Sequence, residues 1–241
     1  MASVHFILQG KGGVGKSLVA SSLLQYFLQK GTAVKGIDTD PVNATLGGYD
    51  EFDISIFNIM DGDNINARRF DEVLEIIFSA SEEQQIVVDN GASSFIPLMS
   101  YLKENDAISL IQSNGHKVFL HTVITGGQAI LDTLKGLKSL CINFPNTPIV
   151  PWLNLFFGDI VNDGKSFDNF KVYKEHLSQF HSVITIPNKN KLTFGKDVED
   201  LLARKESFAA GISSSLPIME RQRLKTYWKE FYEAIDQAGL C

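Results

Sequence analysis

The sequence contains very little cysteine, only Cys141 and Cys241 in 241 residues, and no CxxC pair. This scarcity excludes a disulfide framework and a cysteine-based metal or cluster site, and it fits a reducing cytoplasm. No apolar run approaches the roughly 18 residues that would span a bilayer. The apolar run 4–8 is too short for the core of a signal peptide. We therefore expect a cytoplasmic protein without a transmembrane segment.

An excess of positive charge is also lacking, because the formal net charge is −6. The chain as a whole is therefore not suited to bind DNA or acidic membranes, although a local basic patch stays open. No repeat and no Pro/Ser-rich linker divides the sequence. With 44% hydrophobic and 21% charged residues, the composition is that of an ordinary globular protein. We expect one domain over residues 1–241.

Short apolar runs alternate with longer amphipathic segments along most of the chain. The expected strands are 4–9, 33–38, 85–89, 117–125, 148–153 and 182–187, and the expected helices are 16–29, 66–79, 96–102, 128–140, a helix near 167–180, 194–206 and 219–238. Strands that alternate with helices favour a mostly parallel sheet with helices on both faces. The pattern predicts an α/β fold, and only the segment 47–65 follows neither period cleanly.

The eight residues Gly10-Lys11-Gly12-Gly13-Val14-Gly15-Lys16-Ser17 match GxxxxGK[ST], the phosphate-binding loop. Glycines let the backbone wrap a phosphate so that several N–H groups point at it, and the following helix adds the charge of its N-terminus. Lys16 is expected between the β- and γ-phosphates, and the Ser17 hydroxyl on Mg²⁺. The alternative is a glycine-rich turn without a ligand. An apolar run before the loop and a helix after it favour an ATP site formed by the eight residues and Leu18.

Three aspartates lie at the ends of two expected strands. Asp38 and Asp40 follow the strand 33–38, and Asp89 ends the strand 85–89. Because ligands of an open parallel sheet bind beyond the carboxyl ends of its strands, these acids are expected to converge on the phosphate loop. A carboxylate there can hold Mg²⁺, directly or through water, or orient an attacking water. For each acid alone, the alternative is a solvated residue that caps the next turn.

Lys11 is unusual, because an ordinary phosphate loop does not need a lysine directly after its first glycine. The run KGGVGKS, followed by IDTDP, resembles the deviant Walker A family of P-loop ATPases, which includes ParA, MinD and the nitrogenase iron protein. The resemblance implies an ATPase that forms a nucleotide-dependent homodimer, in which Lys11 reaches the partner's ATP. It implies that Lys16 acts within its own subunit and that Asp40 activates the water, so Lys11, Lys16 and Asp40 are the expected catalytic residues.

The same resemblance extends to the metal and the base. It implies that Ser17 and Asp38 hold Mg²⁺, and we add Asp89 to this set, with part of the contacts through water. Trp152-Leu153-Asn154 is similar to the strand end whose asparagine reads the adenine, and Ile184-Thr185-Ile186-Pro187 is similar to the strand and proline that border the base. Asn154 and Pro187 are therefore expected at the nucleotide; for Asn154 the alternative is a turn-capping residue.

Seven spaced segments resemble the TraL group of conjugative-transfer proteins within this family: LQGKGGVGKS, IDTDPVNAT, NIMDGDNIN, VVDNGASSF, HTVITGGQA, WLN and RQRLK. This resemblance implies a role in plasmid or integrative-element transfer, with conjugation or type IV secretion proteins as partners. Partition ATPases typically carry DPQGNAT, whereas Pro41-Val42-Asn43 follows Asp40 here, without the glutamine and one residue shorter. The segment after Asp89 also lacks the usual prolines. These departures predict hydrolysis that is slow or depends on a partner.

The last expected helix carries apolar residues at helical spacing, with cations nearby. We expect it to pack on the sheet; docking on a membrane surface or a DNA-binding face are the alternatives. Specific DNA binding is not expected. Two other functions stay open: a ParA-like partition ATPase that coats DNA, and a small-molecule ligase or kinase of the same fold, which would need an acceptor pocket.

Overall fold

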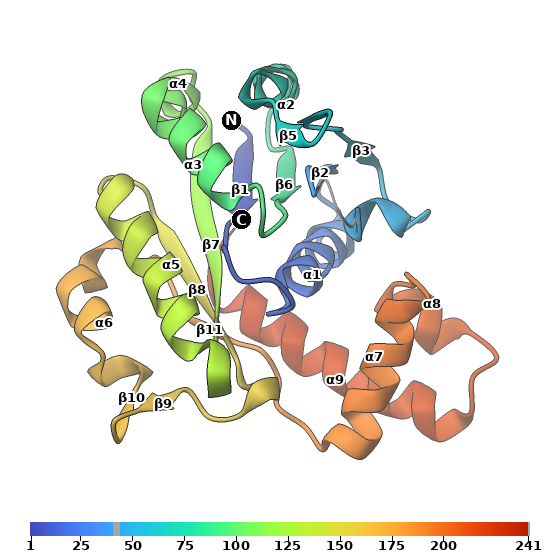
Figure 1. Ribbon diagram of the computed structural model, residues 1–241. Helices are drawn as coiled ribbons and strands as arrows, with labels where there is room; N and C mark the ends of the chain where they lie inside the picture. Colours follow the sequence, from blue (N-terminus) through green and yellow to red (C-terminus); the bar gives the residue numbers. More distant parts are fainter. Residues whose placement is uncertain (41–43, 241) are drawn as a thin grey trace.

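The centre of the protein is a parallel sheet in the order β11-β8-β7-β1-β6-β2-β3, seen in a computed structural model that describes residues 1–40 and 44–240 (Figure 1). Every neighbouring pair of these strands is parallel. The central strands are buried on both faces, which explains why they are near-continuous apolar runs. The strands are β1 (Ser3–Ile7), β2 (Val34–Asp38), β3 (Ile54–Ile56), β6 (Gln85–Asp89), β7 (Lys117–Thr125), β8 (Ile149–Asn154) and β11 (Ile184–Thr185).

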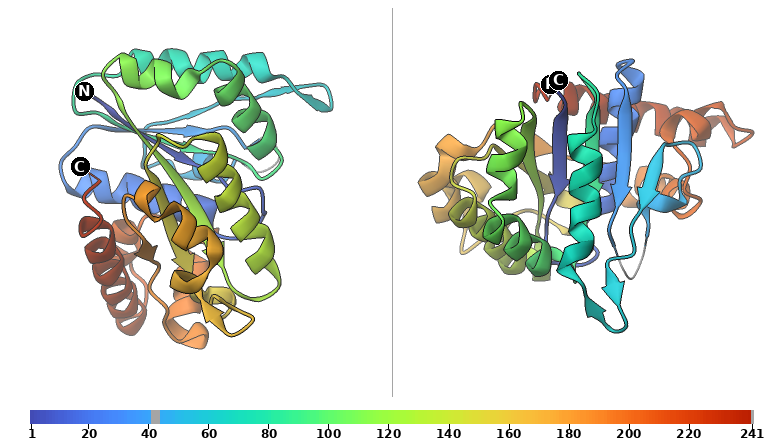
Figure 2. Two further views of the ribbon diagram at one scale, coloured as in Figure 1. Left: turned by 90° about the vertical axis from the view of Figure 1, so that its left-hand side faces the viewer. Right: turned by 90° about the horizontal axis from the view of Figure 1, so that it is seen from above.

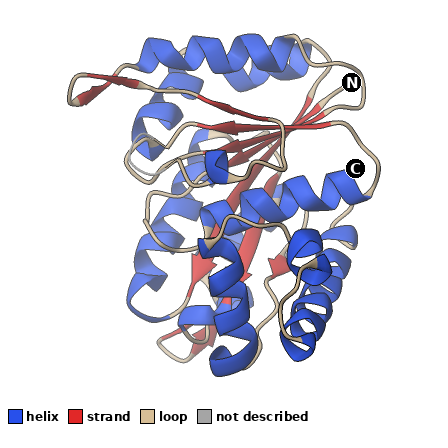
Figure 3. Cartoon of the chain, turned by 90° about the vertical axis from the view of Figure 1, so that its right-hand side faces the viewer, coloured by secondary structure: helices blue, strands red, loops and turns tan. Residues whose placement is uncertain are grey.

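Helices cover both faces of the sheet, so the predicted P-loop α/β fold is confirmed (Figure 3). One face is covered by α2 (Phe70–Phe78), α3 (Phe95–Glu104), α4 (Ala107–Ser113), α5 (Ile130–Asn143) and α6 (Lys171–His176). The other face is covered by α1 (Lys16–Gln29), α7 (Lys196–Ala203), α8 (Phe208–Ser213) and α9 (Ile218–Asp236).

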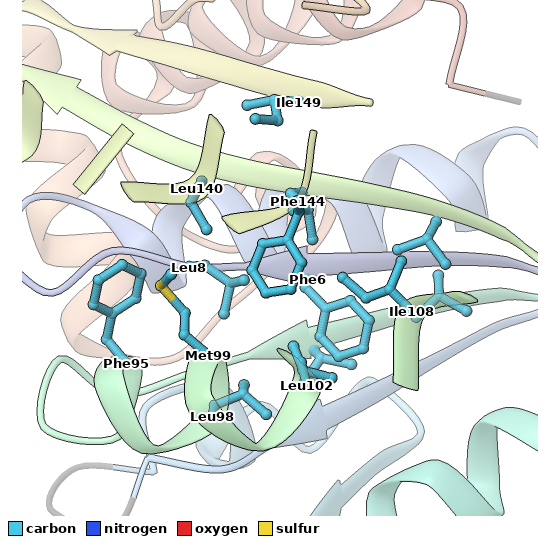
Figure 4. Packing of buried hydrophobic residues seen from close by; sticks show 14 of the residues in the cluster. Phe6, Leu8, Phe95, Leu98, Met99, Leu102, Ile108, Leu140, Phe144 and Ile149 are labelled. Atoms are coloured by element: carbon cyan, nitrogen blue, oxygen red, sulfur yellow. The ribbon is translucent and has the colours of Figure 1, made fainter. Parts of the chain in front are cut away.

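The core between the sheet and α3 follows directly from helical spacing. Phe95, Leu98, Met99 and Leu102 recur on one face of α3 and are all buried. They lie toward Phe6 of β1 and Leu8 just after it, with Leu140 of α5 and Phe144 at the end of that helix beside them (Figure 4). This packing fixes the start of α3, and with it the segment that follows β6, close to the end of β1.

Helix α9 buries its apolar face in the second core. Leu224, Tyr227, Trp228, Phe231 and Ile235 pack there with α1 and the sheet. The apolar stripe that would have served a membrane-docking helix is therefore used inside the protein. Within residues 1–40 and 44–240, no helix is both long and apolar enough to cross a bilayer.

The segment 47–65, which had no clear period, forms the edge strand β3 and a small hairpin of β4 (Met60–Asp61) and β5 (Asn64–Ile65). Edge strands and two-residue strands bury too few side chains to require alternation of apolar and polar residues. The sequence of this segment therefore did not indicate strands. The sequence also did not predict α4 and α8, helices of seven and six residues, or the second hairpin of β9 (Val161–Asn162) and β10 (Lys165–Ser166), because elements this short show too little of any period. The expected strand 182–187 is reduced to two residues.

A buried polar chain crosses the sheet from β8 to β6. Trp152 Nε1 donates to His121 Nδ1 at 2.9 Å, His121 Nε2 lies 2.9 Å from His5 Nδ1, and His5 Nε2 lies 2.9 Å from Gln85 Oε1. Since the indole N–H can only donate, each imidazole must accept on one nitrogen and donate on the other. Burial lowers the pKa of both histidines, that of His5 to about 4, so the chain consists of neutral rings.

Candidate nucleotide-binding site

The phosphate loop connects the end of β1 to the start of α1. Gly13 and Gly15 have φ values of 73° and 105°, a region that only glycine enters without strain. A Cβ at Gly10 would lie 2.9 Å from Cδ1 of Phe95, so the loop also passes close to α3. The first turn of α1 contains no acidic residue and no capping side chain. Its amide groups are therefore left for an anion.

Lys16 is the first residue of α1, and its side chain turns back over the loop. It is only 8% exposed, and its Nζ donates to the carbonyl of Lys11 at 3.2 Å. Burial lowers the pKa of Lys16, while the carboxylates of Asp89 and Asp40 oppose this shift. The ammonium thus lies inside the loop, beside the acidic strand ends.

Asp38 and Asp89 are neighbours in the sheet, because the register of β2 and β6 pairs them. Asp38 is fully buried; its Oδ1 accepts from the amide of Asp40 at 3.0 Å, and its Oδ2 from the amide of Gly47 at 2.9 Å. Burial raises its pKa, and these two backbone bonds oppose the rise. Asp38 therefore holds both the turn after β2 and the short 3-10 turn Leu46–Gly48 in place.

Asp89 has the least compensated carboxylate of the site. It is 2% exposed, and its Oδ1 has no hydrogen-bond partner among the described residues. Burial raises its pKa to about 7, opposed mainly by a hydrogen bond with the Ser17 side chain. A buried oxygen without a partner, next to a hydroxyl and a second carboxylate, fits the oxygen donors that Mg²⁺ prefers. In the described part of the chain, no group of three or more His, Cys, Asp or Glu side chains could hold a metal, so phosphate and water oxygens would have to complete its shell.

We expect Asp89→Asn to stabilise the nucleotide-free protein above pH 7 by roughly 2–4 kcal/mol, since each pKa unit corresponds to about 1.4 kcal/mol. The folded pKa of about 7 lies above the reference value of 3.8, so folding takes up a proton between these values. The cost of burying the ionised carboxylate is therefore full above pH 7, and it declines as the pH falls from 7 toward 4.

Urea denaturation in EDTA at pH 8 and pH 5 measures this difference. The gain should be larger at pH 8 than at pH 5, and Asp63→Asn, at an exposed position, should show no such gain. Equal effects of Asp89→Asn at both pH values would contradict the assignment of an uncompensated carboxylate.

Asp40 lies against the segment that follows β6. A Cβ at Gly91 would stand 2.7 Å from Cγ and Oδ1 of Asp40, so a larger residue there would have to displace the Asp40 carboxylate. Asp40 also lines the phosphate side of the cleft together with Lys16 and Ser17. Pro41-Val42-Asn43, where the sequence differs from the DPQGNAT of partition ATPases, lies outside the described residues.

The side chain of Lys11 is directed toward α5 and not toward the acidic strand ends. Its Nζ forms an ion pair with Asp132 Oδ2 of α5 at 3.0 Å, and the two side chains are 43% and 49% exposed. Its backbone amide donates to Gln9 Oε1 at 3.4 Å. The side-chain amide of buried Gln9 in turn donates to Val123 and Thr133 carbonyls, on β7 and α5. Gln9 and Asp132 were missed in the sequence, since their partners are far along the chain.

An apolar pocket of about 270 Å³ continues from the loop on the side of β8 and β11. Pro187 lines it, and so do Phe156 and Tyr227, which sequence reasoning did not single out. Asn154 also lies there, but its Nδ2 donates to the carbonyl of Val14 at 2.9 Å and its Oδ1 accepts from the amide of Phe156 at 3.0 Å. The amide of Asn154 thus braces the loop. The pocket shares Gly13, Gly15, Leu18 and Leu202 with the phosphate side, a space of about 600 Å³, so the two form one cleft.

The structure brings nearly all the expected site residues to this cleft. Gly12, Gly13, Gly15, Lys16, Ser17, Leu18, Asp40, Asn154 and Pro187 line it. Asp38 and Asp89 end the neighbouring strands β2 and β6, and Asp89 interacts with Lys16 and Ser17. Gly10 lies against Phe95, Val14 is buried in the core, and Lys11 is paired with Asp132. The cleft can accept an anion at the helix N-terminus, a cation at the acidic strand ends and a flat apolar group between β8 and α7.

Comparison with known proteins agrees with this geometry. A family model described as the CobQ/CobB/MinD/ParA nucleotide binding domain matches residues 5–214. Two proteins of Escherichia coli, each named Protein TraL, are 45% and 43% identical over 242 residues, covering 100% of this chain and 100% of each relative.

Two solved structures share the fold at low identity. A plasmid partition protein of Borrelia burgdorferi bound to AMPPNP has a TM-score of 0.54 and 14% identity, covering 100% of this chain and 99% of that chain. The MinC:MinD cell division protein complex of Aquifex aeolicus has a TM-score of 0.52 and 15% identity, covering 95% and 94%.

Proposed function

The chain belongs to the CobQ/CobB/MinD/ParA family of nucleotide-binding domains, and on that premise we propose that it binds ATP with Mg²⁺ and acts as a dimerisation switch that hydrolyses ATP slowly. One observation carries the proposal: a buried lysine at a glycine-wrapped helix N-terminus interacts electrostatically with Asp89, whose buried Oδ1 has no hydrogen-bond partner among the described residues. Three carboxylates and only one ammonium lie there, so the acidic strand ends lack a compensating cation. The amides at the N-terminus of α1 lack an anionic side chain in the first turn. Mg²⁺ would supply the cation, and a triphosphate would supply the anion.

Each residue of the site has a separate role in binding or hydrolysis. Ser17 and Asp89, with Asp38 through water, would hold Mg²⁺, which neutralises phosphate charge when bound. Lys16 and the loop amides hold the β- and γ-phosphates. Asp40 orients a water for in-line attack on the γ-phosphorus; the bond to the bridging oxygen breaks, and ADP and phosphate leave. The apolar pocket beside Pro187 receives the base.

The position of Lys11 is evidence for the nucleotide-dependent dimer. Its ion pair with Asp132 is exposed, and such pairs contribute about 1 kcal/mol or less, so its release costs little. A freed Lys11 on the outer side of the loop can neutralise charge that develops on the nucleotide of a second copy. The resemblance of KGGVGKS to the deviant Walker A motif assigns it this role.

The full-length similarity to Protein TraL supports a role in conjugative transfer of a plasmid or integrative element. We propose that the protein works in the cytoplasm as one domain over residues 1–241, and that conjugation or type IV secretion proteins read its nucleotide state. In that role the switch, and not the rate of hydrolysis, is what the partner detects.

Light scattering with and without MgATP tests the proposal. We expect a mass of 26.7 kDa without nucleotide and about twice that mass with MgATP, most clearly in the hydrolysis-blocked variant Asp40→Ala. A variant that stays monomeric at saturating MgATP contradicts the switch.

Two further measurements separate the rival functions. Salt-sensitive binding to DNA of any sequence, with affinity falling steeply as salt rises, would indicate a partition-type ATPase. ATP turnover that rises with a small metabolite and not with a protein would indicate a ligase or kinase.

A further inference from the structure

The hairpin β4–β5 stands out from the edge of the sheet that carries the nucleotide cleft. The strand β3 ends at Ile56, which is paired with Asp38, and the amide of Phe57 donates to the carbonyl of Asp38 at 2.9 Å. The hairpin therefore begins directly beyond the carboxyl end of the sheet. In both views of Figure 2 it extends farther on this side than any other element.

The hairpin is firmly anchored at its base and exposed at its tip. Ile59 is fully buried, its carbonyl accepts from the amide of Asn66 at 2.8 Å, and Asn58 Oδ1 accepts from the amide of Met60 at 3.0 Å. Asp61 and Asp63 at the tip are exposed and form no ion pair in the described structure.

A second exposed segment follows the strand at the other side of the sheet. β3 and β11 are the two edge strands of the sheet, and a π-helical turn, Lys191–Gly195, follows β11 past its carboxyl end. Leu192 on this turn is 88% exposed. The Lys191 ammonium lies 4.9 Å from the centre of the Phe156 ring and forms no ion pair with any described residue. π-helical turns are rare and are often found at functional sites.

We propose that, in the nucleotide-bound dimer, the β4–β5 hairpin of each copy docks on the π-helical turn 191–195 of the other. A second copy that closes over the phosphate loop approaches the side on which the hairpin projects. The hairpin tip carries Asp61 and Asp63 and the turn carries Lys191 and Leu192, so a two-fold rotation that brings each hairpin onto the turn of the other copy places opposite charges together. Each contact then occurs twice, as an isologous interface requires. This inference rests on the dimer of the proposed function.

Charge reversal tests the pairing. Asp61→Lys/Asp63→Lys should leave MgATP affinity unchanged by calorimetry, but should raise the dimer dissociation constant about tenfold. Lys191→Asp should have the same effect on dimerisation. The combined charge-swapped variant, with all three substitutions, should return to within about threefold of the parent, because only a direct contact gives such coupling. The matched control is Glu82→Lys/Glu83→Lys, an equal charge change in the turn before β6, at the opposite edge.

Sedimentation with Mg²⁺ and a slowly hydrolysed ATP analogue, at low salt, distinguishes the outcomes. A parent protein that stays monomeric overturns both the switch and the docking. A parent that dimerises together with reversed variants that dimerise equally well overturns the docking alone. Reversed variants that are monomeric, and that the charge-swapped variant does not restore, overturn the assignment of the π-helical turn as the hairpin's contact.

Discussion

Lys16→Ala should abolish ATP binding, with an affinity at least about 100-fold weaker than that of the parent. The lysine is buried inside the loop and supplies a full positive charge where the β- and γ-phosphates are expected. Charge-assisted hydrogen bonds in such a site contribute about 1.5–3 kcal/mol each, and Lys16 would make two of them. Without it, the phosphates would also face Asp40 and Asp89 with less compensation.

Titration calorimetry with a slowly hydrolysed ATP analogue and Mg²⁺ measures this loss. Lys16→Met, which keeps the apolar stem, separates loss of charge from loss of packing, and both variants should keep the circular dichroism of the parent. An affinity within threefold of the parent in either folded variant would show that Lys16 does not hold the phosphates.

Lys11→Ala should spare ATP binding in the monomer and should lose the nucleotide-dependent dimer. If Lys11 acts in trans as an arginine finger does, turnover should fall by about 1,000-fold or more. The reason is its position: the ammonium lies on the outer side of the loop, paired with Asp132 and away from the acids that surround Lys16.

Light scattering and a phosphate-release assay on the same samples test this prediction. Lys135→Ala, which removes an exposed lysine from α5, is the control and should behave as the parent. Asp132→Asn frees Lys11 without removing it and should leave dimerisation equal or up to about fivefold stronger. A Lys11→Ala protein that still dimerises with MgATP contradicts a role across the interface.

Continuous patterns in the sequence were sufficient for the central part of the fold. The bounds of α1, β6 and β7 agree with prediction, because each is long, buried and strongly periodic. Prediction failed at the sheet edges and in the hairpins. β3 has three residues and one partner strand, so packing with distant residues, and not local period, decides its existence.

The candidate site divides in the same way. The loop and its three aspartates could be placed from the sequence because the motif is local and the strand ends of a parallel sheet share one edge. The partners of the motif could not. Asp132 is 121 positions from Lys11 and Phe156 is far from the loop in the chain, and neither belongs to a local pattern. For Asn154 the sequence offered turn capping as the alternative, and its Oδ1 does accept from the amide of Phe156, at the start of the 3-10 turn Leu155–Phe157. Its bond to Val14 could not be predicted, since that bond appears only when β8 and the loop are brought together.

The bonds of Gln9 have a consequence for the energetics of ligand binding. Its amide reaches across to β7 and α5, and Gly136 of α5 leaves the room that it needs: a Cβ there would lie 2.4 Å from Gln9 Oε1. The entrance of the loop is therefore preorganised by contacts made during folding, before any nucleotide arrives. Less conformational entropy is lost on association, so more of the interaction with the triphosphate is expressed as affinity. In this protein, the ordering of the loop entrance is a property of its fold.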